Sequence, residues 1–371
     1  MNTHGLPLLL AGALTLGALP ARAADDIPYP ALAARIVSAL KVTSGERVLL
    51  RYDPQTLGAL EPVVRRQLEA AGARVESLTY APAADLAERL ARTDVYIWLP
   101  AGETATTAAS ERALLASWLD AGKGRQIHFH WNGGTRDVDG LPVPHTAPYD
   151  AVYVDALNID YAALAQRQDA AVALLRSGET RVTTPGGTDL RFRIGDRPFN
   201  KQDGDASAAR MQSAKVRVDR EIELPAGVLR VAPVEASVQG TLVIPKARFG
   251  TAIVTNARLT FADGKVTKAT ADEGLAALQT FLDSAPGSKS FREFCIGFNP
   301  KLNVPAGQTA LPYYGYGDAV VRLSLGDNEE VGGTVRGGGV RWLFFPDTTV
   351  TVGSATLVEA GKLTTTQTAT P

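Results

Sequence analysis

The sequence predicts a two-domain α/β protein, with an N-terminal parallel-sheet α/β domain followed by a mostly antiparallel α+β domain. Three observations lead to this prediction. Helical and strand patterns alternate up to about residue 132, strand patterns dominate after residue 181, and the 371 residues are enough for two domains. The expected boundaries are 24–155 for the first domain and 156–363 for the second.

In the first domain, short apolar runs alternate with amphipathic stretches. Arg47–Tyr52 has the composition of a strand, and Leu57–Ala71 carries apolar residues at helical spacing before Gly72 ends it. Such repeated β–α–β units with short connections indicate a parallel sheet covered by helices on both faces. The other expected helices are Ala31–Leu40, Ala84–Ala91 and Thr104–Ala121, and the other expected strands are Val75–Tyr80, Val95–Leu99 and Ile127–Trp131.

The second domain follows a Pro- and Gly-containing stretch at 133–148. Helices are expected over Asp160–Leu175 and around Glu273–Leu282, and Asp263-Gly264 is typical of a hairpin turn. Many strands and few helices favour antiparallel sheets. The expected strands are Arg181–Thr184, Leu190–Ile194, Lys215–Val218, Leu229–Val231, Thr241–Ile244, Leu259–Phe261, Lys265–Thr267, Ala319–Leu325 and Thr348–Val352.

Both ends of the chain are expected to lie outside the folded domains. Residues 1–23 have the pattern of a signal peptide, with an apolar run at Leu6–Leu19 and a small-residue cleavage pattern at Ala21-Arg22-Ala23. No Cys follows to carry a lipid, so no membrane anchor is expected, and the protein is predicted to be periplasmic or secreted. The polar tail at 364–371 is expected to be disordered.

Composition excludes several classes of function. Lys and Arg number 38 against 39 Asp and Glu, which gives no basic excess for a nucleic acid. The single Cys295 excludes an intramolecular disulfide and a Cys-rich metal site. Only four His residues occur, so a metal site built from several imidazoles has few candidates.

Family resemblance enters in the second domain. Five segments stand in order there: Ala156–Tyr161, the Gly-Thr-Asp-Leu run at 187–190, Leu224–Gly240 with its Leu-Pro-Ala-Gly start, Leu259–Val266 and Glu293–Asn299. Together they resemble the aminopeptidase T-type metalloaminopeptidases, the thermophilic aminopeptidase family, over about residues 30–363. The resemblance implies a homodimer whose ancestor removed N-terminal residues from peptides with two divalent metals.

The metal positions depart from that family. The resemblance implies two Glu, two His and one Asp as ligands, and a Tyr that assists catalysis stands where this chain has Glu329. The corresponding ligand positions here are Val228, Glu293, Arg322, Arg341 and Leu343, so only Glu293 is retained. Val and Leu offer no donor atom, and Arg stays protonated. The sequence therefore predicts a catalytically inactive pseudoenzyme without a cofactor.

The replaced positions suggest two other roles. Arg230 follows Val228 by two residues, so it shares a strand face and could converge with Arg322 and Arg341 around Glu293. With Trp342, these arginines could bind a small anionic ligand or a peptide carboxylate, because guanidinium groups hold such anions bidentately. Alternatively, the charges could pair with one another and plug the old metal cavity.

A second possible metal site lies in the first domain. His128 and His130 are two residues apart at the end of a strand, so both rings project to one side. With His145 or Asp150 they could bind a divalent metal such as zinc or iron. An active metallo-aminopeptidase with a non-standard site, using Zn, Co or Mn, is therefore the alternative function.

Overall fold

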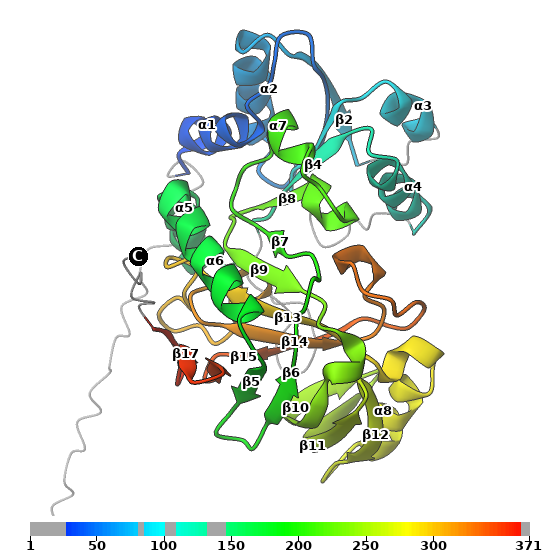
Figure 1. The fold of residues 1–371 in the computed structure, drawn as a ribbon. Helices are drawn as coiled ribbons and strands as arrows, with labels where there is room; N and C mark the ends of the chain where they lie inside the picture. Colours follow the sequence, from blue (N-terminus) through cyan, green and yellow to red (C-terminus); the bar gives the residue numbers. More distant parts are fainter. Residues whose placement is uncertain (1–26, 81–84, 101–108, 132–145, 365–371) are drawn as a thin grey trace, which may run out of the picture.

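Three β-sheets organise the chain in the computed structural model, which describes residues 27–80, 85–100, 109–131 and 146–364 (Figure 1). The first sheet is parallel and the other two are antiparallel, which confirms the predicted fold class. The expected signal peptide and His145 lie outside the described residues. No helix among the described residues is long and apolar enough to cross a bilayer.

The N-terminal sheet has the strand order β2-β1-β3-β4-β8, and all its neighbouring strands are parallel. Its strands are β1 (Arg47–Tyr52), β2 (Arg74–Thr79), β3 (Val95–Trp98), β4 (Arg125–Phe129) and β8 (Glu221–Leu224). The helices around it are α1 (Tyr29–Leu40), α2 (Leu60–Ala70), α3 (Leu86–Ala91) and α4 (Ala109–Asp120). These elements agree with the predicted ones, except that β8 comes from the second half of the chain.

Both faces of this sheet are buried. Val48 and Leu50 of β1 pack in one apolar cluster with α1 and α2, whereas Leu49, between them, packs in another with α3 and α4. Successive strand residues point to opposite faces, so an uninterrupted apolar run is what a strand covered on both sides requires.

The second half forms two antiparallel sheets. One has the order β12 (Lys265–Thr270), β11 (Ala252–Ala262), β10 (Gln239–Phe249), β6 (Asp189–Phe192), β5 (Thr180–Thr183), β16 (Thr349–Val352), β17 (Ala355–Glu359) and β18 (Lys362–Leu363). The other has the order β15 (Arg341–Phe345), β14 (Val321–Leu325), β13 (Phe291–Gly297), β9 (Val228–Val231) and β7 (Asn200–Lys201). The helices of this half are α5 (Ala147–Leu157), α6 (Tyr161–Arg176), α7 (Ala208–Met211) and α8 (Leu275–Leu282).

Local signals explain two details of this half. Asp263 and Gly264 both have positive φ, 50° and 76°, and they join β11 to β12 as the predicted hairpin turn. The expected strand Lys215–Val218 is wrong, because a 3₁₀ helix, η2 (Arg217–Arg220), forms there. The Asp219 carboxylate accepts a hydrogen bond from the backbone N–H of Lys215, at 2.8 Å, and such a bond competes with strand pairing.

One short segment joins the parallel sheet to an antiparallel sheet. β8 ends at Leu224, and β9 begins at Val228, so only residues 225–227 separate the two sheets. Gly227 lies between them with φ 149°, and a Cβ there would lie 2.6 Å from the Cβ of Asn299. This crossing places the ends of β4 and β8 beside the sheet that carries Glu293.

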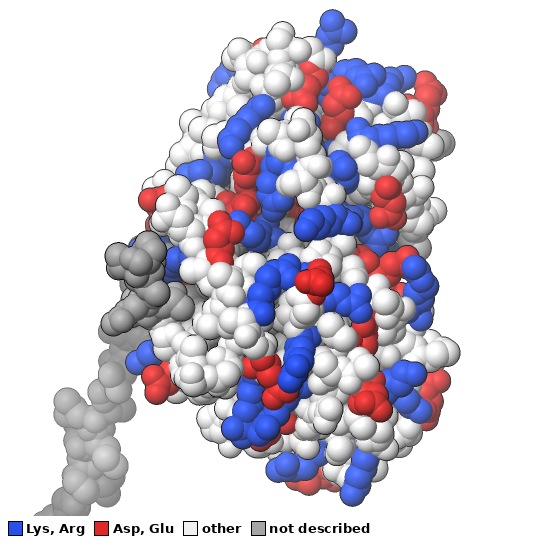
Figure 2. All heavy atoms as spheres, viewed as in Figure 1, with Lys and Arg blue, Asp and Glu red and all other residues white. Residues whose placement is uncertain are grey.

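Charged side chains of both signs are mixed on one face of the molecule. On the face shown in Figure 2, Lys and Arg alternate with Asp and Glu, in keeping with a net charge of −1. This face does not resemble the single-sign basic surface typical of nucleic-acid binding.

We expect Gly227→Ala to lower the free energy of unfolding by about 2–4 kcal/mol, because the new methyl group meets Asn299 and the backbone has a conformation that disfavours side chains. Gly250→Ala is the control: Gly250 also has positive φ, 59°, but no atom lies within 4 Å of its added Cβ. It should cost only about 1 kcal/mol. Urea unfolding of both variants measures the difference, and equal effects would contradict the close approach.

Candidate functional site

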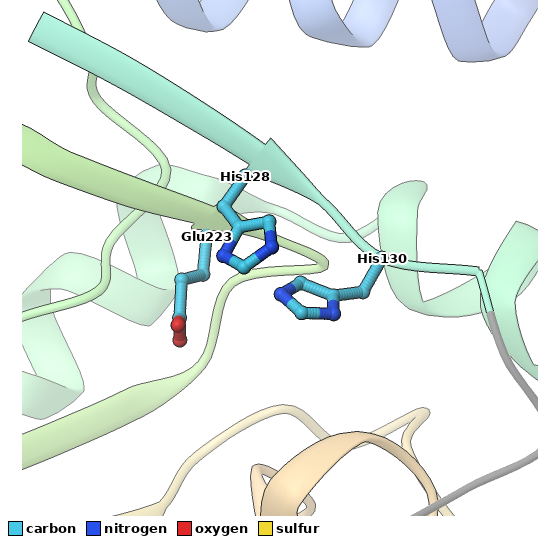
Figure 3. A group of neighbouring side chains, drawn as sticks. All are labelled: His128, His130 and Glu223. Atoms are coloured by element: carbon cyan, nitrogen blue, oxygen red, sulfur yellow. The ribbon is translucent and has the colours of Figure 1, made fainter. Parts of the chain in front are cut away.

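Three potential metal ligands meet at the carboxyl edge of the parallel sheet. His128 of β4 pairs in register with Glu223 of β8, and His130 follows His128 by two residues, with its backbone N–H donating to the Leu224 carbonyl at 2.8 Å. One ligand atom from each of the three side chains lies within 4.8 Å of the other two. Figure 3 shows the two rings turned toward each other and Glu223 beside them. We call these residues the histidine cluster.

His130 is the buried member of the histidine cluster, whereas His128 and Glu223 are half-buried. His130 is only 4% exposed, and its Nε2 atom has no hydrogen-bond partner among the described residues. Burial, followed by the neighbouring His128, lowers the pKa of His130 well below 6.5. Its ring is therefore neutral at physiological pH, which leaves a nitrogen lone pair available.

Aromatic side chains surround the histidine cluster. The Trp98 ring lies 4.3 Å from that of His128, and the Tyr313 ring lies 4.3 Å from that of His130, measured between centroids. Tyr313 and Tyr314 have φ values of 38° and 46°, a left-handed conformation that costs about 1–3 kcal/mol per residue and is concentrated at functional sites. The Tyr316 hydroxyl donates a hydrogen bond to Glu223.

A second group lies in the adjacent antiparallel sheet. Glu293 of β13 is 0% exposed; Arg230 of β9 contacts its Oε2 atom at 3.0 Å, and Arg322 of β14 contacts its Oε1 atom at 3.2 Å. Arg292 lies 3.6 Å from Oε1, and Glu330 accepts from both Arg230 and Arg292. We call these five residues the arginine network.

The arginine network keeps Glu293 ionised. Burial alone would raise its pKa, but Arg230, Arg292 and Arg322 outweigh that effect and hold the pKa of Glu293 well below 4.5. Three guanidinium groups and two carboxylates leave a formal charge of +1 in the network.

The other family positions contribute no metal donors. Val228 and Leu343 are 1% and 5% exposed, and both are apolar. Arg322 offers N–H donors only and pairs with Glu293. The residues present therefore do not fit the dimetal centre that the family resemblance implies.

Arg341 does not converge with the other arginines as predicted. Arg341 pairs with Leu325 across the sheet, whereas Arg322 pairs with Phe344. Arg341 therefore lies three residues along β15 from the position opposite Arg322. The Arg341 guanidinium lies 5.0 Å above the Phe249 ring. Trp342 does approach the network, because Arg322 lies 5.5 Å above its ring.

Sequence reasoning missed Arg292, Glu330 and Glu223. Strand alternation places Arg292 and Glu293 on opposite faces, but a register irregularity between Phe291 and Phe294 brings both side chains to the network. Glu223 was missed because a strand from the second half was not expected in the first sheet; the alternating Glu221–Leu224 pattern was its only local signal.

Two other predicted residues have different partners. Asp150, a possible companion of the histidines, accepts a hydrogen bond from Trp131 at 2.7 Å. Glu329, at the position of the family's assisting Tyr, pairs with Arg336, and both side chains are more than half exposed.

Comparisons with known proteins show a similarity to one family in part of the chain, and a shared fold. Residues 164–304 match the family model described as thermophilic metalloprotease (M29). No curated protein matches the chain. A solved structure of 2,5-dihydroxypyridine dioxygenase from Pseudomonas putida KT2440 is similar, with a TM-score of 0.61, 16% identity and coverage of 93% of this chain and 99% of that one. Wild-type AmpT from Thermus thermophilus is similar with a TM-score of 0.59, 14% identity and coverage of 90% and 98%.

At these identities the two structures show a shared fold. The family match also supports the predicted resemblance, because it spans four of the five segments on which that resemblance rests, from Gly187 to Asn299. Residues 164–304 of this aminopeptidase-like chain are thus similar to the thermophilic metalloprotease family M29.

Proposed function

We propose that this protein is an aminopeptidase-like pseudoenzyme, which does not hydrolyse peptides through the family's dimetal centre. The observation that carries the proposal is the position of Glu293. It is the one retained ligand position, it is fully buried, and both of its carboxylate oxygens already face guanidinium groups. A divalent cation arriving there would meet three fixed positive charges.

Breaking the ion pairs of the arginine network would also lower the stability of the fold. A buried charge that loses its partner typically destabilises a protein by about 3–5 kcal/mol, so freeing Glu293 for a metal would leave uncompensated arginines. Because Glu330 balances Arg230 and Arg292 from the other side, the network closes the former metal position with internal partners.

The comparisons support the fold of this chain but do not specify its reaction. AmpT and a dioxygenase share this fold, so the fold is not tied to one reaction, and activity must be argued from the residues of the site. From the N-terminal pattern and the family resemblance, we further propose that the protein is exported and forms a homodimer.

A second candidate role is the binding of a small anion or peptide carboxylate. The observation that favours it is the surplus positive charge of the arginine network, together with the buried Nε–H of Arg322, which has no hydrogen-bond partner among the described residues. Arg322 lies at the edge of the network nearest Tyr316 and Trp342, so an anion would be recognised between a guanidinium and aromatic rings.

The pseudoenzyme proposal predicts no metal-dependent hydrolysis of leucine p-nitroanilide above the protein-free rate when Zn²⁺, Co²⁺ or Mn²⁺ is added. AmpT assayed in parallel is the positive control. Turnover that disappears in Glu293→Gln would contradict the proposal. Turnover that survives Glu293→Gln but disappears in His130→Ala would place hydrolysis at the histidine cluster instead.

We expect Glu293→Gln to destabilise the protein by about 3–5 kcal/mol at neutral pH, because three arginines would then face one carboxylate. The pKa of Glu293 is depressed in the folded state. Ionised Glu293 therefore stabilises the fold above its unfolded-state pKa near 4.5, and this stabilisation is lost progressively as the pH falls below that value. The difference in free energy of unfolding between wild type and Glu293→Gln should therefore become smaller at acidic pH.

Urea unfolding between neutral pH and about pH 3 measures this effect. Glu329→Gln is the matched control, since its partner Arg336 is exposed, and it should change stability by less than about 1 kcal/mol. A gap that stays constant with pH would count against ionised Glu293 as the centre of the network.

For the anion role, we expect acetate or a dipeptide to bind the wild-type protein in calorimetric titration and to bind Arg322→Met at least about tenfold more weakly, because charge-assisted hydrogen bonds would be lost. Arg336→Met, at an exposed site, should bind as the wild type does. Circular dichroism confirms folding. Equal affinities for all three proteins would rule out Arg322 as the anion ligand.

A further inference from the structure

The histidine cluster has the geometry of an incomplete coordination sphere. Donors bound about 2.1 Å from one ion lie roughly 3–4 Å from each other. The ligand atoms of His128, His130 and Glu223 already lie within 4.8 Å of one another. Side-chain movements of under about 1 Å, which rotamer adjustment supplies, would therefore bring all three to one metal ion.

Independent support comes from unsatisfied polar atoms. The Nε2 atom of His130 is buried and has no hydrogen-bond partner among the described residues. An unsatisfied buried polar group costs about 1–3 kcal/mol, so such atoms need an explanation. The two rings lie 3.9 Å apart between centroids and face the same space, which a shared ligand would explain.

Neighbouring groups resemble the outer shell of a metal site. The Nδ1 atom of His128 lies 3.2 Å from a Glu221 carboxylate oxygen, although it lacks the alignment of a hydrogen bond. Metal-binding imidazoles commonly direct their second nitrogen to a carboxylate in this way. Tyr316 donates to Glu223 and so orients the carboxylate. The backbone bond from His130 to Leu224 fixes the end of β4 against β8.

Charge and donor type select the ion. Imidazoles bind metals in their neutral form, so a ligand set of two imidazoles and the Glu223 carboxylate has a formal charge of −1, and the Glu221 carboxylate lies nearby. Nitrogen donors favour transition metals over calcium and magnesium. Three protein ligands also leave at least one coordination position open, as in catalytic rather than structural zinc sites.

We infer that His128, His130 and Glu223 bind one divalent transition-metal ion at a site bordered by Trp98 and Tyr313. This site uses none of the family's ligand positions and does not depend on the pseudoenzyme proposal. The candidate companions His145 and Asp150 are not needed, because Glu223 supplies the third ligand.

The test is metal binding by the full protein without a His tag. Calorimetric titration with Zn²⁺, and Co²⁺ titration followed by its visible absorption, should both show one equivalent bound. Glu223→Gln and His130→Ala should each weaken the affinity at least about 100-fold, and Glu221→Gln by about 10–100-fold, as outer-shell changes do.

Two controls separate this inference from the proposed function. Glu329→Gln, the same change on the exposed surface, and Glu293→Gln, in the arginine network, should leave the affinity unchanged. His130→Gln keeps a side chain in the buried position if His130→Ala fails to fold. No stoichiometric binding by the wild type, or binding that survives both Glu223→Gln and His130→Gln, would overturn the inference.

Discussion

The parallel pairing of β4 with β8 is the constraint on which both clusters depend. β8 belongs by sequence to the second half of the chain but pairs with β4 in the first sheet. Residues 225–227 then connect it to β9, in the sheet that holds Glu293. The pairing register places Glu223 opposite His128. The short return brings the arginine network close to the same edge. Carboxyl ends of parallel strands are where open α/β sheets gather ligands, and here an antiparallel sheet borders that edge.

The arginine network shows how a fully buried carboxylate can stay ionised inside the fold. A lone buried carboxylate would be protonated or would destabilise the fold, because burial penalises its charge. Arg230 and Arg322 remove that penalty for Glu293, but the added positive charges need a partner of their own. Glu330 supplies it, together with the Asp327 carbonyl that accepts from Arg292. The three arginines and two carboxylates therefore stabilise one another as a set of compensating charges, and none of them is balanced by a single partner.

Local patterns were sufficient to predict most elements of the first domain, because the spacing of apolar residues there matches the residues that each helix or strand buries. Arg47–Tyr52, for example, is β1 with the predicted bounds. They were insufficient where distant segments meet. β8 joins a strand almost 100 residues earlier in the chain, so Glu223 could not be assigned to His128. A register irregularity lies beside Arg292 in β13, and strand register, which no local pattern specifies, separates Arg341 from Arg322.

Tyr316 connects the two clusters. Its hydroxyl donates to Glu223, while Arg322 lies 5.7 Å from its ring centroid and is itself held by Glu293. Burial, followed by the Glu223 carboxylate, raises the pKa of Tyr316 well above 10, so the phenol keeps the proton that it donates. The orientation of Glu223 thus rests on a tyrosine whose ring also borders the arginine network. The histidine cluster and the arginine network therefore meet at one tyrosine without sharing a ligand.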